Sequence, residues 1–191
     1  MSKILVTGAS GFVGSRLCEV VARDGWNVRR AVRQFSGRQD EVVAQLSNDA
    51  DWSEALKNID VVIHLAARVH VMNDNAIDPL TEFRAVNTSA TLCFAKQAVE
   101  SGVKRFIFLS SIKVNGEFTQ SGLAFKSDDG FILTDPYGLS KYEAEQGLLK
   151  LAEQTDMEVV IIRPPLVYGP GVKANFASMV KWVNRGVPFP F

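Results

Sequence analysis

Lys3-Ile4-Leu5-Val6-Thr7-Gly8-Ala9-Ser10-Gly11-Phe12-Val13-Gly14 is the stretch that decides the fold. Residues 3–7 are apolar and rich in β-branched side chains, which predicts a buried strand. A G-x-x-G-x-x-G turn follows at once, and apolar residues at helical spacing follow the turn. Although the spacing differs from G-x-G-x-x-G, a strand, a Gly-rich turn and a helix form the context in which a dinucleotide pyrophosphate binds at a helix N-terminus.

Apolar runs alternate with helical patterns along the rest of the chain. We expect strands at Asn27–Val32, Val42–Leu46, Val61–Ala67, Arg105–Leu109 and Val159–Ile162, and helices at Thr81–Glu100, Tyr137–Gln154 and Ala174–Asn184. Residues 117–134 are polar and predict a long loop. The alternation predicts an α/β fold, a Rossmann-type doubly wound parallel sheet with helices on both faces. Ligands of such sheets bind beyond the carboxyl ends of the strands.

Composition excludes several other functions. The 191 residues include 21 basic and 21 acidic side chains, so the formal net charge is zero and gives no support for nucleic-acid or membrane-surface binding. No apolar stretch is long enough to span a bilayer. Cys18 and Cys93 are expected to be buried thiols of a cytoplasmic protein. His64 lies in an apolar run and His70 lacks a cluster of ligands, so we expect no metal site.

Three polar residues predict acid–base chemistry. Tyr137 and Lys141 are four residues apart, which places them on one face of a helix. The pKa of a free Tyr is about 10, and a neighbouring ammonium lowers it. With Lys141 and a cationic cofactor ring, a phenol pKa near 7 requires a shift of about 3 units. Ser111, just beyond the strand Arg105–Leu109, would hydrogen-bond the same substrate oxygen.

Several short motifs occur in a recognisable order. They are Gly8-x-x-Gly11-x-x-Gly14, His64-Leu65-Ala66-Ala67, Asn87, Ser110-Ser111, Tyr137-x-x-x-Lys141 and Arg163-Pro164-x-x-Val167-Tyr168-Gly169-Pro170. Together they resemble the extended short-chain dehydrogenase/reductase family. Within it, the likeness is to NAD(P)-dependent nucleotide-sugar epimerases and dehydratases of the UDP-glucose 4-epimerase type.

The resemblance implies an enzyme and assigns roles. Tyr137 would be the catalytic acid/base, assisted by Ser111. Lys141 would bind the nicotinamide ribose and lower the Tyr137 pKa, and Asn87 would hold the active-site helix or a water molecule. The implied cofactor contacts are Gly8, Ser10, Gly11, Phe12, Val13, Gly14, Leu65, Ala66, Ala67, Lys141, Pro164 and Val167. Asn175 would contact the substrate diphosphate or base.

The resemblance also implies a reaction. A 4-epimerase oxidises a nucleotide sugar, here expected to be UDP-linked, to a keto-sugar and returns the hydride to the other face. Ile112 and Lys113 replace the Asp-Glu pair of dehydratases, which argues against that reaction. Asn115 replaces an aromatic residue at the wall of the substrate pocket.

Family members are longer than this chain. The resemblance implies that residues 1–170 form the dinucleotide-binding domain and residues 171–191 begin a substrate-binding region, most of the small C-terminal domain being absent. It further implies a homodimer through the Thr81–Glu100 and Tyr137–Gln154 helices.

The choice between NAD and NADP is open. Proteins that bind NAD carry an acidic residue at the end of the second strand, where it holds the ribose hydroxyls. This chain has Val32 at that position, followed by Arg33. A cation there suits the 2′-phosphate of NADP, whereas the family likeness favours NAD. Gln45 and Leu46 are expected to border the adenine, with Asp49 the nearest acid.

Two further alternatives remain open. Three interpretations of the function are open: an epimerase, an NADP-dependent reductase of the dihydroflavonol or aldehyde type, and a non-catalytic dinucleotide-binding module. Arg68 and Lys113 either bind an anionic substrate group together, or Lys113 faces solvent or pairs with Glu117.

Overall fold

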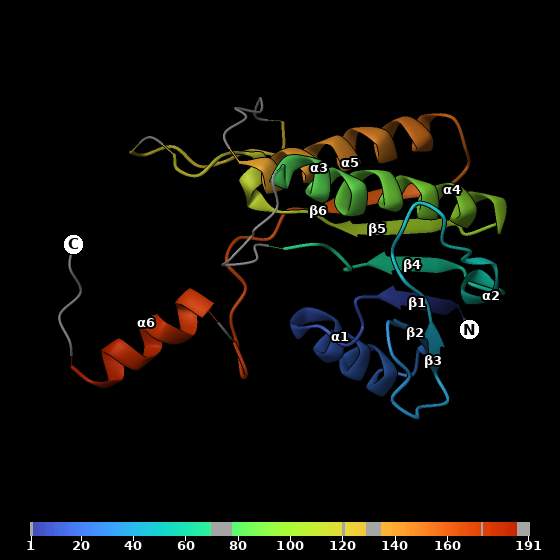
Figure 1. Ribbon diagram of the computed structural model, residues 1–191, viewed down its shortest axis with the longest axis horizontal. Coiled ribbons are helices and arrows are strands. Elements are labelled where there is room, and N and C mark those ends of the chain that lie inside the picture. The colour runs from blue at the N-terminus through green and yellow to red at the C-terminus, as the bar shows by residue number, and fades with distance from the viewer. Residues whose placement is uncertain (1, 70–77, 120, 129–134, 173, 187–191) are drawn as a thin grey trace.

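The computed structural model describes residues 2–69, 78–119, 121–128, 135–172 and 174–186, without the side chains of residues 174 and 175. These residues form a six-stranded parallel sheet in the order β3-β2-β1-β4-β5-β6. The strands are β1 (Lys3–Thr7), β2 (Asn27–Val32), β3 (Glu41–Val43), β4 (Val61–His64), β5 (Arg105–Leu109) and β6 (Glu158–Ile162). This order is that of a doubly wound Rossmann sheet and confirms the predicted fold class (Figure 1).

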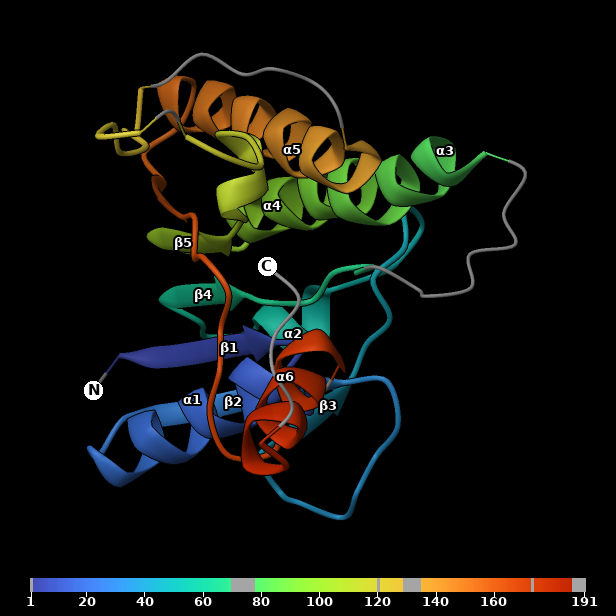
Figure 2. The same cartoon turned by 90° about the vertical axis from the view of Figure 1, so that its left-hand side faces the viewer.

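Helices cover both faces of the sheet. The helices of the described chain are α1 (Phe12–Arg23), α2 (Ser53–Leu56), α3 (Pro79–Phe83), α4 (Thr91–Glu100), α5 (Pro136–Glu153) and α6 (Ala174–Asn184), with a π-helical segment η1 (Arg84–Ala90) and a 3₁₀ turn η2 (Ile112–Val114). Side chains of α4 and α5 share one core with β5, whereas α1 packs on the opposite face (Figure 2). Helix α6 lies apart from the sheet, beyond the carboxyl ends of the strands (Figure 1). In the described part of the chain, no helix is long and apolar enough to cross a bilayer.

Several element boundaries differ from the prediction. Strand β3 ends at Val43 rather than Leu46, because its partner β2 ends at Val32. The helix expected from Thr81 begins at Pro79, where Asp78 caps it by accepting the Thr81 N–H at 3.2 Å. The short helix α2 and the turn η2 were not predicted, because both are too short to show a periodic pattern.

A hydrogen-bond network ends β4 at His64, three residues before the end of the predicted strand. The Thr7 hydroxyl oxygen accepts the backbone N–H groups of Leu65 and Ala66, each at 3.2 Å. Its own proton is then donated to His64 Nδ1 at 2.7 Å, and His64 Nε2–H donates to the Thr91 hydroxyl at 3.0 Å. The network joins β1, β4 and α4 at the point where the strand order reverses.

The environment of His64 keeps its imidazole neutral. The ring is fully buried and lies close to Phe94, Phe106 and Phe108. Burial, with the nearby charge of Lys141, lowers the pKa of His64 to about 3. The expectation that His64 is a structural residue agrees with this contact set.

We expect His64 to make the protein less stable as the pH falls. The unfolded chain takes up a proton at His64 near pH 6.5, whereas the folded chain does so only near pH 3. Between these values the unfolded state binds more protons, so the free energy of unfolding falls by up to about 1.4 kcal/mol per pH unit. Urea unfolding of the wild type and His64→Phe at about pH 7 and about pH 5 measures this effect. The variant should show the shallower pH dependence, and equal slopes would contradict the buried neutral imidazole.

Candidate active site

The Gly-rich turn forms a cradle with little room for side chains. Gly8 has a φ of 65°, and a Cβ atom there would lie 2.8 Å from the Ala66 backbone nitrogen. A Cβ atom on Gly14 would lie 2.2 Å from the Gly8 carbonyl oxygen. The Gly11 N–H donates to that same oxygen at 2.9 Å, which closes the turn at the start of α1. The bare backbone at a helix N-terminus fits the pyrophosphate of a dinucleotide.

The neighbouring strand end presents backbone and small side chains. Leu65, Ala66 and Ala67 are half-buried directly after β4. Because Thr7 already accepts the Leu65 and Ala66 N–H groups, a ligand can meet only the carbonyl oxygens and side chains of these two residues. Ser10 and Phe12 are exposed and Val13 is half-buried beside the cradle. The Phe12 ring comes within 3.9 Å of where a Gly169 Cβ would lie, so residues of the C-terminal motif border this crevice.

Ser111 lies at the carboxyl end of β5 and begins the turn η2. Its hydroxyl oxygen accepts the backbone N–H of Lys113 at 3.3 Å, which caps the turn. Among the described residues no acceptor takes the hydroxyl proton, which can therefore be donated to a ligand. The Ile112 N–H donates to the Pro164 carbonyl at 3.1 Å, so η2 is fixed to the segment after β6.

Tyr137 lies in the first turn of α5. The helix is capped by Asp135, whose carboxylate accepts the Gly138 N–H at 2.8 Å, and Pro136 occupies the first turn. The Tyr137 ring contacts the edge of Phe83 with 5.9 Å between centroids. Burial and, to a smaller extent, the Asp135 charge raise the pKa of Tyr137 to about 12. In the protein alone, without a cofactor, the Tyr137 pKa is therefore not lowered by Lys141.

Lys141 is a buried side chain of α5 whose amine lies against the last residue of β5. Its ammonium donates to the Leu109 carbonyl at 3.0 Å and lies 4.5 Å from the centroid of the Phe108 ring. Burial lowers the pKa of Lys141 to about 7, and the Glu145 charge opposes this shift. Among the described residues, Leu109 is its only hydrogen-bond acceptor, so two of its three N–H donors are available to a ligand.

Asn87 connects α5 to the segment after β4, as its implied helix-holding role would require. The side chain is fully buried in the π-helical segment η1. Its amide oxygen accepts the Arg68 N–H at 2.8 Å, and its amide nitrogen donates to the Arg68 carbonyl and the Ser140 hydroxyl, each at 3.0 Å. Asn87 thereby connects the segment after β4 to the turn of α5 between Tyr137 and Lys141.

Arg163 forms a second connection, between α5 and the segment after β5. Its guanidinium is paired bidentately with Glu145, a fully buried carboxylate of α5. The same guanidinium donates to Asn115 Oδ1 at 3.2 Å and to the Ser127 carbonyl at 3.1 Å. Asn115 Nδ2 donates to the Lys126 carbonyl at 2.7 Å. The residue that replaces an aromatic side chain thus anchors the loop that follows it.

The end of β2 has the cationic character expected from the sequence. Arg33 is exposed directly after Val32, and no hydrogen bond or ion pair to it occurs in the described part of the chain. The neighbouring arginines differ, because Arg30 and Arg38 both pair with Asp40. Gln45 is exposed, whereas Leu46 packs partly on the core. Leu46 therefore has less surface available to an adenine ring than Gln45.

The predicted substrate residues have different surroundings. Lys113 lies 3.4 Å from Asp135 and 4.0 Å from Glu117, so the expected pairing with Glu117 occurs but is the longer of the two. Arg68 lies 3.9 Å from Glu82 and stacks over Phe83. Of the two predicted cofactor contacts after β6, Pro164 is half-buried and Val167 is exposed. The side chain of Asn175 lies outside the described part of the structure.

Two residues of the site were missed by the sequence analysis. Asp135 precedes Pro136, and an acidic residue before Pro at a helix start is a recognisable capping signal. Thr7 precedes Gly8, and no local pattern predicts that its hydroxyl would accept two N–H groups from β4. The contact is long-range and depends on the sheet order.

Comparisons with known proteins agree with this geometry. The sequence model of the family described as "NAD dependent epimerase/dehydratase family" matches residues 4–186. A UDP-glucose 4-epimerase of Vibrio cholerae is 52% identical over 98% of this chain and 58% of its own length. The chain thus spans little more than half the length of that relative.

Solved structures show the same fold. MoeE5, in complex with UDP-glucuronic acid and NAD, superposes with a TM-score of 0.82 at 31% identity, over 98% of this chain and 63% of its own. A UDP-glucuronic acid 4-epimerase from Bacillus cereus, in complex with NAD, gives a TM-score of 0.81 at 25% identity, over 97% of this chain and 64% of its own. From the family match along almost the whole sequence and the Rossmann sheet with its Gly-rich cradle, we conclude that the chain belongs to the NAD dependent epimerase/dehydratase family.

Proposed function

We propose that the complete protein is a nucleotide-sugar 4-epimerase that holds a nicotinamide dinucleotide throughout its cycle. The observation that carries this proposal is the position of Ser111, Tyr137 and Lys141, which are brought to one end of the sheet beside the glycine cradle. The Vibrio cholerae relative supports the 4-epimerase type, and MoeE5 supports a UDP-linked sugar. Residues 1–170 would be the dinucleotide-binding domain, and residues 171–191 would begin the substrate-binding region.

In this proposal Tyr137 transfers the proton of the sugar hydroxyl, and Ser111 hydrogen-bonds the sugar oxygen. The Tyr137 phenolate removes the proton of the sugar hydroxyl, and the Ser111 hydroxyl donates a hydrogen bond to the oxygen that becomes a carbonyl. When bound, the oxidised nicotinamide supplies the hydride acceptor and a positive charge. After the keto-sugar has turned over, Tyr137 returns the proton to the other epimer.

Lys141 has two tasks in this proposal. Two of its N–H donors would bind the ribose of the dinucleotide, because its third is used by Leu109. In its charged form it would also favour the Tyr137 phenolate. Burial and Asp135 hold the Tyr137 pKa near 12 in the protein alone, so the charges that arrive with the ligand would have to lower it for catalysis near neutral pH.

A reductase is the second candidate, and Arg33 favours it. An exposed cation at the end of β2, without an ion-pair partner among the described residues, suits the 2′-phosphate of NADP, and NADP-dependent enzymes commonly carry out a net reduction. Such an enzyme would use Tyr137 as the acid that protonates a keto-sugar oxygen. The two candidates differ in stoichiometry, because a reductase consumes one reduced dinucleotide for each product and an epimerase consumes none.

Replacing the phenol tests the acid–base role. We expect Tyr137→Phe in the complete protein to lower turnover by at least about a hundredfold, since a lost general acid/base has this effect. Dinucleotide affinity, measured by calorimetry, should stay nearly unchanged. Lys141→Ala should lower both turnover and affinity because Lys141 has two roles. Near-normal turnover of Tyr137→Phe would contradict the mechanism.

Reversing the charge at the end of β2 tests cofactor choice. We expect Arg33→Glu to weaken NADP binding and to spare or improve NAD binding, because the carboxylate repels a 2′-phosphate and accepts ribose hydroxyls. Titration of both dinucleotides against wild type and variant measures this. Arg16→Glu, on the exposed face of α1, is the control for net charge. If Arg33→Glu leaves both affinities unchanged, Arg33 is only a solvated surface charge.

The helical stretch Thr81–Glu100, which spans α3, η1 and α4, and helix α5 also support a homodimer with isologous symmetry. Helices α4 and α5 lie side by side on the outside of the sheet, and Leu149 of α5 is 43% exposed. We expect light scattering to give a dimer mass, and Leu149→Glu to shift it toward the monomer. Phe35→Glu, which changes another exposed apolar residue, should leave the dimer intact. A monomer for the wild type at micromolar concentration would count against this arrangement.

A further inference from the structure

We propose that Lys113 is a positioning residue of the active site, and that its ammonium acts through the Asp135 carboxylate on the helix turn that carries Tyr137. This inference rests on the proposed function, because it assigns catalysis to Ser111 and Tyr137. It differs from the substrate-binding role that the sequence suggested for Lys113.

The backbone of Lys113 connects the Ser111 side chain to the first turn of α5, which carries Tyr137. Its N–H donates to the Ser111 hydroxyl oxygen at 3.3 Å and fixes the start of η2. Its carbonyl oxygen lies against α5, 3.0 Å from where a Cβ atom on Gly138 would be. Only glycine permits this approach without displacement, so η2 and the first turn of α5 are in direct backbone contact next to Tyr137.

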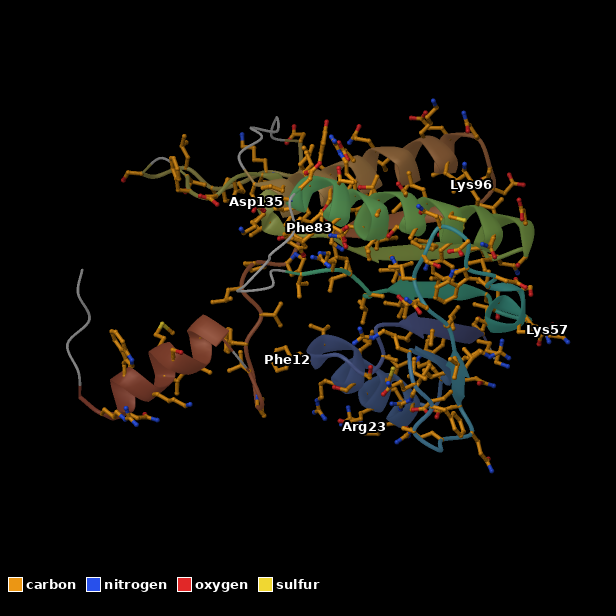
Figure 3. All side chains as sticks on the ribbon, viewed as in Figure 1. Phe12, Arg23, Lys57, Phe83, Lys96 and Asp135 are labelled. Atoms are coloured by element: carbon orange, nitrogen blue, oxygen red, sulfur yellow. The ribbon has the colours of Figure 1, made fainter. Side chains whose placement is uncertain are left out.

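The side chain of Lys113 extends the same connection. Its ammonium lies 3.4 Å from Asp135 Oδ2, and this oxygen accepts the Gly138 N–H at 2.8 Å. The Asp135 side chain is only 12% exposed, whereas the competing Glu117 is 57% exposed and farther away, at 4.0 Å. Because screening by water weakens exposed ion pairs, Asp135 is the stronger partner. Figure 3 shows Asp135 close to Phe83, whose ring contacts Tyr137.

The charge of Asp135 makes this connection relevant to chemistry. Asp135 is the charged residue that raises the pKa of Tyr137, and a neighbouring cation reduces that effect. Among the described residues, the charged groups around this turn include Lys141, whose ammonium donates to the Leu109 carbonyl, and two ion pairs, Arg84 with Glu143 and Arg68 with Glu82. Lys113, at 3.4 Å, is a cation placed to offset the charge of Asp135.

The experiment compares pH–rate profiles of the complete enzyme with bound dinucleotide, using UDP-glucose and UDP-glucuronic acid. Lys113→Met should move the acidic limb of the kcat profile to higher pH by about 0.5 to 1 unit, because the phenolate is then harder to form. Asp135→Asn should move the limb to lower pH. Asn caps a helix about as well as Asp, so this variant keeps the fold.

Three further variants sharpen the test. Lys113→Met added to Asp135→Asn should cause no further shift, because the route through Asp135 is absent. Lys113→Arg should restore the wild-type profile. Lys57→Met removes an exposed lysine far from Asp135 and should leave the profile unchanged (Figure 3).

Two outcomes would overturn the proposal. An increase in KM confined to UDP-glucuronic acid, without a shift of the pH profile, would make Lys113 a ligand of the substrate anion. An equal shift in the Asp135→Asn background would mean that Lys113 acts on Tyr137 directly.

A measurement without substrate separates this proposal from the proposed function. Absence of epimerisation by the wild type would refute the proposed function alone. In that case hydrogen exchange of the Gly138 amide decides the structural part of the proposal. Faster exchange in Lys113→Met than in Lys113→Arg supports the connection through Asp135, and equal exchange overturns it.

Discussion

The rest of the site depends on the close approach of β1 and β4 at their carboxyl ends. Gly8 leaves no room for a side chain against Ala66, and the Thr7 hydroxyl takes the two N–H groups that follow β4. His64, which is hydrogen-bonded to Thr7, is also hydrogen-bonded to Thr91 of α4. A bulkier residue at Gly8 would separate the strands at the point where the sheet order reverses, and this is where a doubly wound sheet binds its ligand.

The second constraint is the burial of ionisable groups around α5. Lys141 and Glu145 are almost fully buried on one helix, and each is satisfied from a neighbouring strand end, by the Leu109 carbonyl and by Arg163. A buried charge without such a partner is costly. These contacts fix the rotation of α5 over the sheet, so Tyr137 is placed by the burial of residues that follow it in the helix. Among the described residues the Lys141 ammonium has one acceptor, the Leu109 carbonyl, and in the proposed function its other N–H groups would bind ribose hydroxyls.

Most of the fold could be predicted from the sequence, because β1, α1 and the buried strands carry strong apolar periodicity. The positions of Ser111 after a strand and of Tyr137 and Lys141 on one helix were predicted as well, and their catalytic roles stay predictions. The remaining parts depend on long-range contacts that leave no local pattern. These include the Thr7 network that ends β4 early, the anchoring of a loop by Asn115, and the partner of Lys113. Burial and the Asp135 charge raise the Tyr137 pKa in the protein alone, and the lowering expected with Lys141 and a bound cationic cofactor stays a prediction.

The most direct test of the proposed chemistry is the fate of the hydride in the complete enzyme. UDP-glucose carrying deuterium at C4 is incubated with the protein and a catalytic amount of dinucleotide, and the products are analysed by NMR and mass spectrometry. An epimerase built around Ser111, Tyr137 and Lys141 returns the same hydride, so the account predicts the C4 epimer with its deuterium retained. An epimer without deuterium would contradict the account, as would release of a keto-sugar with stoichiometric change of the dinucleotide.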